Sequence, residues 1–219
     1  MDKALLIAKT ARDPDDRLLL ARVLDKYDQC QRRAVPAVTG FLSQREAALA
    51  QALLNAAVIR GGFAFDGGYP DAERRILIFL PDWLEEPEEE LAFLRAAFHG
   101  GDSSLTHRDV LGSLMGLGIV REKVGDILVG PESADLVVLD TVADFLLQSW
   151  TSAGRTHLKV TAVEPGELQI PETKMEEVRD TVSSLRLDAV VSSALRMARG
   201  KAAEPVSYTH LRAHETRRH

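Results

Sequence analysis

The chain has 219 residues, of which 45% are hydrophobic and 27% are charged, values typical of globular proteins and not of disordered chains. No apolar run approaches the roughly 20 residues that cross a bilayer, and we expect neither a membrane span nor a secretory signal. The single cysteine, Cys30, cannot form an internal disulfide, and no cysteine and histidine residues have the spacing of a zinc site. We therefore expect a cytoplasmic protein without a metal or other cofactor.

The net charge of −6 is unevenly distributed along the sequence. Residues 1–178 contain 19 basic and 29 acidic side chains, whereas residues 179–219 contain 8 basic and 4 acidic side chains. The overall balance argues weakly against a general nucleic-acid binder, but the basic side chains are concentrated in the C-terminal segment.

The N-terminal segment is predicted to be helical. A capping aspartate followed by proline, and apolar residues at helical spacing, predict a helix over 14–33. A capping-box pattern at Ser43 and Glu46 predicts a second helix over 47–58. We therefore expect residues 1–62 to form an N-terminal helical region.

A region of mixed strands and helices is predicted next, over residues 63–163. A turn-rich loop at 63–71 precedes the apolar run 76–80, which predicts a buried strand. The segment 91–98 is ambiguous between strand and helix, and we favour a strand. The elements expected after it are a helix at 107–117, opened by a Thr106 and Asp109 capping pair, strands at 125–129 and 134–140, a helix at 141–150 and a strand at 157–163. The order from residue 91 is therefore β-α-β-β-α-β, a split β-α-β arrangement.

The C-terminal part is predicted to begin with a linker. Residues 164–180 contain two prolines, a glycine and mixed charges, and this composition is typical of a linker. Beyond it, apolar residues at helical spacing predict one helix around 187–194 and the start of another at about Ala198.

Several segments resemble a known family. They are GGYPDAERR (67–75), LTHRDVLGSLMGLGIVREKVGDILV (105–129), TSAGR (151–155) and SSLRLDAVVSSALRMARGKAAE (183–204). With these segments the chain resembles the YlmH-type family of bacterial RNA-binding proteins. The resemblance implies an α+β fold, with an RRM-like domain at 63–163 and a fragment of an S4-type αL RNA-binding domain at 181–205.

The same resemblance implies a function. It implies a non-catalytic RNA-binding protein that contacts rRNA or tRNA on the ribosomal large subunit, in the handling of stalled large subunits. We expect no membrane or DNA partner. The alternative from a different class is a protein-interaction adaptor, whose acidic N-terminal region docks a partner while its RNA contacts are incidental.

Cations in the C-terminal segment are the first candidate RNA-binding residues. Arg186, Arg199 and Lys201 lie on or between two short helices, where cations can contact phosphates while apolar neighbours pack inward. An ordinary solvated helix face is the alternative interpretation, and the family resemblance favours RNA contact.

Other candidate cations lie in the middle region. His107 and Arg108 begin a predicted helix, whose exposed amides favour a phosphate, although a structural role is the alternative. Arg121, Lys123 and Arg155 are loop cations beside the small sheet, for which a solvated surface is the alternative. The strands 125–129 and 134–140 contain no aromatic residue, so we do not expect RNA bases to stack on them.

A catalytic role is not expected. His107 and Asp109 invite a base-and-orienter interpretation, but helix capping explains Thr106 and Asp109, and no serine or cysteine has a recognisable nucleophile elbow. No glycine-rich phosphate loop is present in the sequence either.

The last residues do not continue the family pattern. After Glu204 an S4 domain should add strands, but PVSYTHLRAHETRRH follows, which resembles translated adapter sequence at the broken ends of metagenomic assemblies. We therefore expect 206–219 to be a non-native tail, its histidines not to be metal ligands, and the S4 domain to be truncated.

Overall fold

The computed structural model describes residues 3–87, 89–98, 105–171, 181–182, 186–194, 196 and 198. The chain divides into two compact units, Met1–Pro171 and Glu172–His219. Each unit is described by itself. The content of helices and strands is that of an α+β protein, as the sequence predicted.

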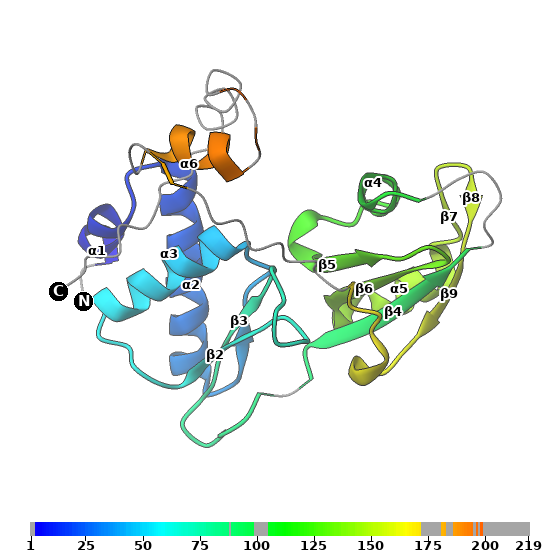
Figure 1. Ribbon diagram of the computed structural model, residues 1–219. Coiled ribbons are helices and arrows are strands. Elements are labelled where there is room, and N and C mark those ends of the chain that lie inside the picture. Colours follow the sequence, from blue (N-terminus) through cyan, green and yellow to red (C-terminus); the bar gives the residue numbers. More distant parts are fainter. Residues whose placement is uncertain are drawn as a thin grey trace. The chain divides into compact units, whose positions relative to one another are not determined.

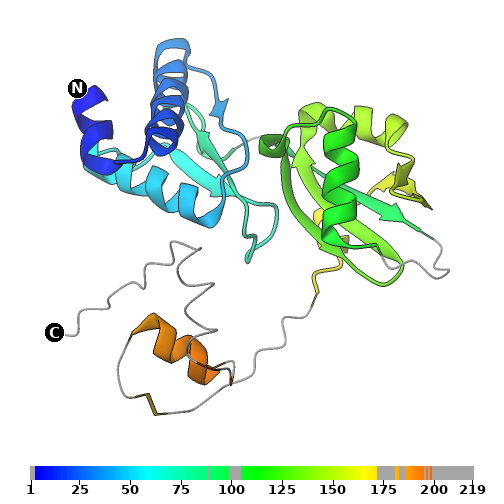
Figure 2. The ribbon, with the colours of Figure 1, turned by 90° about the horizontal axis from the view of Figure 1, so that it is seen from above.

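The first unit begins with the helices α1 (Lys3–Thr10), α2 (Pro14–Arg33) and α3 (Gln44–Ala56). The predicted caps are confirmed: the Asp13 side chain accepts from the Asp15 amide, and Ser43 and Glu46 form a capping box. α1 was not predicted, because its short apolar run is flanked by few cap signals. Figures 1 and 2 show these helices grouped around a small sheet.

That sheet consists of β1 (Ala37–Val38), β2 (Phe63–Asp66) and β3 (Ile76–Phe79), in the antiparallel order β1-β3-β2. Leu77 and Phe79 of β3 pack against the helices, while Ile76 and Ile78 pack on the opposite side. The prediction of a loop from residue 63 is wrong for β2. Four residues beside an Asp-Gly-Gly turn carry little strand signal, and backbone pairing with β3 stabilises them.

A second, four-stranded sheet follows, and all its neighbouring strands are antiparallel, in the order β5-β6-β4-β9. The elements of this part are β4 (Leu91–Ala97), α4 (His107–Gly116), the 3₁₀ helix η1 (Arg121–Lys123), β5 (Val124–Val129), β6 (Ser133–Leu139), α5 (Asp140–Ser149), the hairpin strands β7 (Ser152–Ala153) and β8 (Thr156–His157), and β9 (Lys159–Ala162). Because β2 and β3 pair with β1, we propose that the boundary between the N-terminal and middle regions lies between β3 and β4 instead of at residue 62.

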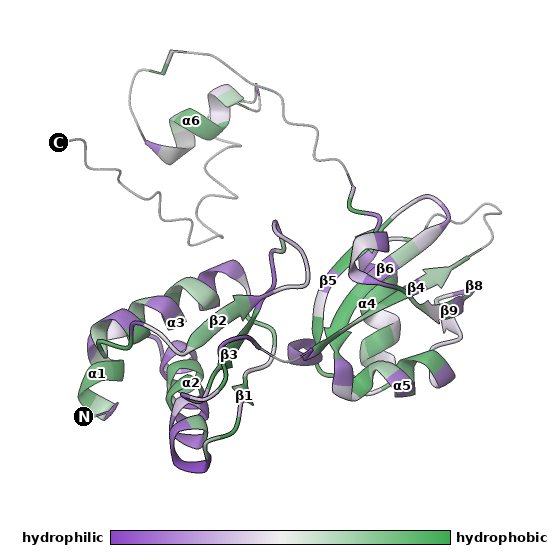
Figure 3. Cartoon of the chain, turned by 90° about the horizontal axis from the view of Figure 1, so that it is seen from below, coloured by the Kyte–Doolittle hydropathy of each residue, from purple (hydrophilic) through white to green (hydrophobic). Residues whose placement is uncertain are grey.

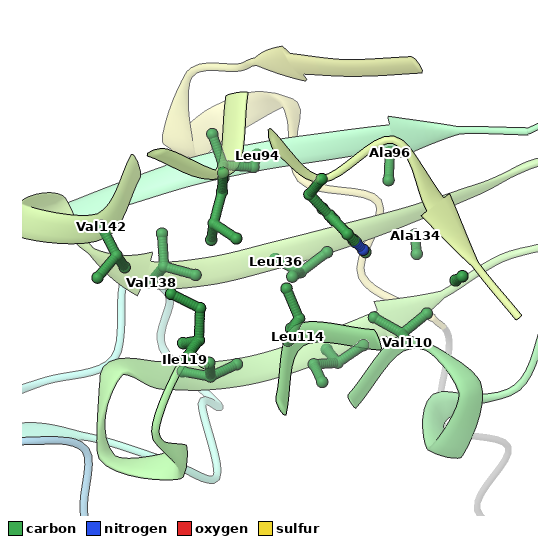
Figure 4. Close-up of a cluster of buried hydrophobic side chains, with 14 of the residues drawn as sticks. Leu94, Ala96, Val110, Leu114, Ile119, Ala134, Leu136, Val138 and Val142 are labelled. Carbon is green, nitrogen blue, oxygen red and sulfur yellow. The ribbon is translucent and has the colours of Figure 1, made fainter. Parts of the chain in front are cut away.

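Both α4 and α5 cover one face of the four-stranded sheet. Leu94 and Leu136 point from the strands toward Val110 and Leu114 of α4, and Val142 of α5 joins the same cluster (Figure 4). Burying each such side chain contributes roughly 1.5–3 kcal/mol, so this cluster holds the helices and the sheet together. Figure 3 shows the matching pattern, with hydrophobic residues predominating in β5 and β6.

The segment after β9 and the second unit are described only in part. A short 3₁₀ helix, η2 (Pro165–Glu167), lies in the segment predicted as a linker, and residues 172–180 are outside the described ranges. In the second unit, α6 (Leu187–Ala194) confirms the predicted helix. The expected tail, 206–219, also lies outside the described residues.

Candidate nucleic-acid interface

The predicted cations of the first unit lie at opposite ends of the four-stranded sheet. Ala97 pairs with both Ser133 and Lys159, so β4 ends where β6 and β9 begin. The hairpin β7–β8 directly precedes β9 and packs against α4, which begins at this end, whereas η1 leads into β5 at the other end (Figure 1). The first end holds His107, Arg108 and Arg155, and the second holds Arg121 and Lys123.

The start of α4 is built by a capping box. The Thr106 amide and hydroxyl donate to Oδ2 of Asp109 over 3.0 and 2.6 Å, and the Asp109 amide lies 3.3 Å from the Thr106 hydroxyl. These hydrogen bonds from Thr106 lower the pKa of Asp109. The carboxylate that a His107 base would need is therefore used for capping, as predicted, while His107 and Arg108 are exposed.

The hairpin places Arg155 at an exposed turn. Ser152 pairs with His157, and Gly154 has the left-handed φ of 59° that such a turn requires. Trp150, 1% exposed, anchors the hairpin by donating its indole N–H to the Ser113 hydroxyl of α4 over 2.8 Å. The Arg155 side chain is thus carried on a turn that the core holds in place.

A histidine and a lysine also lie at this end of the sheet, and sequence reasoning did not select them as candidate RNA-binding residues. His157 ends the hairpin and Lys159 begins β9, and both are exposed. Their signal was in the sequence, since they occupy the polar positions of the alternating segment 157–163.

At the other end, Arg121 is turned onto the backbone. Its Nη1 donates to the Val124 and Gly125 carbonyls over 2.6 and 3.2 Å. Burial, with the nearby charge of Arg74, lowers the pKa of Arg121. Lys123 Nζ lies 3.4 Å from the Thr141 hydroxyl. Hydrogen bonds within the protein thus engage both residues, and an RNA contact by either stays a prediction.

Asp126 of β5 joins the two sheets of the first unit. Its carboxylate accepts from the Tyr69 hydroxyl over 2.6 Å and from the Glu73 and Arg74 amides over 2.7 and 3.1 Å. Burial, followed by the hydrogen bond to Asp126, raises the pKa of Tyr69. We call these four residues the Asp126 clasp, and sequence reasoning missed them because they lie far apart in the chain.

Arg74 extends the clasp along the strand. Its guanidinium donates to the carbonyls of Val124 and Phe41 over 3.0 Å each and of Arg121 over 3.3 Å. Burial lowers the pKa of Arg74. The segment GGYPDAERR, which carried part of the family resemblance, therefore acts structurally here, because its side chains and amides hold the N-terminal sheet against β5.

The face of the four-stranded sheet opposite the helices is covered over its central strands β4 and β6. At one end, Val137 is fully buried against Phe41 and Ile78 of the N-terminal part. At the other end, Arg95 forms a bidentate ion pair with buried Asp135, with both distances 2.7 Å. The segment after β9 lies over this pair, since the Gln169 amide donates to Asp135 and Arg95 donates to the Glu167 carbonyl. Over β4 and β6 the outer face is therefore occupied by the protein itself, whereas Lys159 and Thr161 at the β9 edge are exposed.

Of the three candidate cations in the C-terminal segment, the structure describes one. Arg186 is exposed and directly precedes α6, and its carbonyl accepts from the Ala189 and Val190 amides over 3.0 Å each. Arg199 and Lys201 lie outside the described residues. The grouping of these cations on one surface stays a prediction.

A shallow hollow of about 360 Å³ lies beside α3, with Gln51, Phe65 and Arg75 in its lining. Within the described ranges, no group of His, Cys, Asp and Glu side chains could hold a metal ion. In the same part of the chain, no helix is long and apolar enough to cross a membrane.

Comparison with known proteins gives related matches. Residues 90–167 match the family model described as "Putative RNA-binding domain in YlmH". Over 189 residues the chain is 35% identical to the ribosome-associated protein quality control protein P2 of Bacillus subtilis (strain 168), covering 85% of this chain and 73% of that protein. The solved structure of the cell division protein YlmH from Streptococcus pneumoniae has a TM-score of 0.61 and 20% identity, covering 74% of this chain and 98% of that one. At that identity the structural likeness shows the fold alone.

Proposed function

Because this chain belongs to the YlmH family, we propose that it is a non-catalytic RNA-binding protein that acts on the ribosome. The matched range 90–167 runs from the residue before β4 to the end of η2, so it coincides with the four-stranded sheet, its helices and the hairpin. This coincidence is the observation that carries the proposal. The printed name of the Bacillus subtilis relative, a ribosome-associated quality control protein, supports the ribosomal part.

The finer proposal concerns partners and architecture. We propose that the RNA is rRNA or tRNA at the large subunit, in the handling of stalled subunits. The order β5-β6-β4-β9 with α4 and α5 on one face supports an RRM-like middle domain. The helix α6 and the basic residues after it support an S4-type segment at 181–205.

The test uses the salt dependence of RNA binding. Each phosphate contact contributes a slope of about 0.7–0.9 to the fall of log affinity with log salt. Changing Arg186, Arg199 and Lys201 together to Ala should reduce that slope by roughly 2–3 for rRNA and tRNA fragments alike. Fluorescence anisotropy at several KCl concentrations measures it. An unchanged slope would remove these cations from the RNA site.

A protein-interaction adaptor is the second candidate, and an exposed tryptophan favours it. Trp83 is 62% exposed while its indole N–H donates to the Ala34 carbonyl over 2.8 Å, and Val35 beside it is 43% exposed. Glutamates follow at 85–86 and 88–90. A chain that shows no salt-dependent binding to either RNA would favour the adaptor.

A further inference from the structure

We propose that one end of the four-stranded sheet, formed by Arg155, His157, Lys159 and the first turn of α4, binds the sugar–phosphate backbone of a double-helical RNA segment. This inference rests on the RNA-binding function proposed above and names where the middle region contacts RNA and which kind of RNA it takes. We call this surface the hairpin end.

First, the sheet face that RRM-type domains use to bind RNA is covered here over the central strands β4 and β6. An RRM-type sheet reads single-stranded RNA by stacking bases on aromatic residues of its open face. Here the Phe93 ring lies on that face, and Gly68 packs directly on it. A Cβ added to Gly68 would lie 2.5 Å from the ring. The ion pair between Arg95 and the buried Asp135, with the overlying Gln169, occupies this face further along β4 and β6, while Lys159 and Thr161 at the β9 edge are exposed. RNA could reach the central strands β4 and β6 on this face only by displacing both coverings.

The second step is the chemistry of the hairpin end. Arg155, His157 and Lys159 are exposed within five consecutive residues, which span at most roughly 17 Å. His107 and Arg108 begin α4 at the same end of the sheet. Acidic side chains here include Asp109, which is engaged in capping, and Glu132 in the β5–β6 turn. The cations thus outnumber the free carboxylates among the described residues of this end.

The third step selects the kind of RNA. The aromatic side chains nearest in sequence to this end, Phe98 and Trp150, are 3% and 1% exposed, so neither is available to stack on a base. Among the described side chains of this end, the two histidines and the two arginines can also stack on a base, but all five basic side chains can contact phosphates and riboses, through which double-helical RNA is mainly recognised. The hairpin end therefore matches a helical stem better than an unpaired strand.

The experiment compares two RNA probes and two charge-reversal variants of the full chain. The probes are an RNA hairpin with a stem of about 16 base pairs and an unstructured strand of equal length. The variant R155E/K159E should bind the stem about tenfold more weakly near 0.1 M KCl, with a salt slope smaller by roughly 1.5. The control R22E/R60E changes the net charge equally on exposed residues of the N-terminal part, and should change affinity by less than about threefold.

The same comparison should hold in the R186A/R199A/K201A background, which removes the C-terminal contribution. Unchanged stem affinity in R155E/K159E, or tighter binding of the unpaired strand than of the stem, would overturn the inference. If the unaltered chain binds neither probe in a salt-dependent way, the proposed function itself fails. Circular dichroism verifies folding, and R155A/K159A, with a smaller expected loss, replaces the reversal variant if that variant unfolds.

Discussion

At the scale of single residues, the junction of the two sheets depends on one carboxylate. Asp126 accepts three hydrogen bonds from the segment 69–74, and Arg74 continues the contact along the backbone of β5. A partly buried donor that loses its partner costs roughly 1–3 kcal/mol. The clasp therefore makes the position of the N-terminal sheet sensitive to a single substitution.

The first prediction concerns the clasp. Asp126→Ala leaves the Tyr69 hydroxyl and the Glu73 and Arg74 amides without their acceptor, so it should lower the free energy of unfolding by roughly 2–4 kcal/mol. Tyr69→Phe removes one hydrogen bond and should cost about 1 kcal/mol. Urea unfolding followed by circular dichroism measures both. Equal losses for the two variants would contradict the role assigned to Asp126.

A second residue-scale prediction concerns acid stability. Hydrogen bonds from Arg45 lower the pKa of Asp16, so the pair stabilises the fold above the ordinary aspartate value and this stabilisation is lost as pH falls through the lowered pKa. The Arg45 side chain is 66% exposed, and screening limits the contribution to about 1 kcal/mol or less. Asp16→Asn should therefore destabilise at pH 7, and this loss should shrink as pH falls below the ordinary aspartate value.

The pH dependence is measured by urea unfolding at pH values on both sides of the aspartate range. Asp15→Asn, an exposed neighbour in the same helical turn, is the matched control and should show a smaller effect. If Asp16→Asn costs the same at every pH, the ion pair does not supply the stabilisation.

At the scale of elements, one glycine of β5 is needed for close packing against the N-terminal part, whereas one glycine of α4 is not. A Cβ on Gly125 of β5 would lie 2.6 Å from Cε1 of Phe41 and 3.0 Å from the Val137 carbonyl, so only glycine lets the N-terminal part pack there. Gly112 of α4, in contrast, has no neighbour within 4 Å of such a Cβ. The two glycines therefore have opposite roles.

The third prediction tests this contrast. Gly125→Ala should destabilise the fold by roughly 1–3 kcal/mol because the Phe41 ring must move. Gly112→Ala should stabilise it by roughly 0.5–1 kcal/mol, since alanine favours a helix interior and meets open space. Thermal unfolding compares the pair. Destabilisation by both substitutions would show that the surroundings of Gly112 are not open.

At the scale of the whole molecule, the chain divides into two units after Pro171. Both sheets, the Asp126 clasp and the hairpin end belong to the first unit. The predicted S4-type cations belong to the second. RNA binding would then combine cations from two parts of the chain, and linked weak contacts raise the overall affinity.

The fourth prediction follows from this division. A fragment of residues 1–171 should unfold with the same free energy as the first unit does in the full chain, to within about 0.5 kcal/mol. The reason is that the core clusters of this unit consist of its own residues. It should also keep the binding to the RNA stem that Arg155 and Lys159 support. A fragment that fails to fold would show that the first unit depends on residues after 171.

Much of the local structure could be predicted from the sequence. The caps at Asp13, Ser43 and Thr106 were identified correctly because each signal lies within about four residues of the start of its helix. The strand at 91–97, which periodicity left ambiguous but which was favoured, and the order of the longer helices and strands after it are confirmed, whereas the hairpin β7–β8 was not predicted.

By itself, then, the sequence determined the elements, the family and the cations that are candidates for RNA contact. Only the tertiary structure decided that β2 and β3 pair with β1, that the outer face of β4 and β6 is covered, and that Arg155 and Arg121 lie at opposite ends. The physical reason is range. Caps and periodicity depend on neighbouring residues, whereas the Tyr69–Asp126 hydrogen bond joins residues 57 positions apart and forms only when both sheets have folded together.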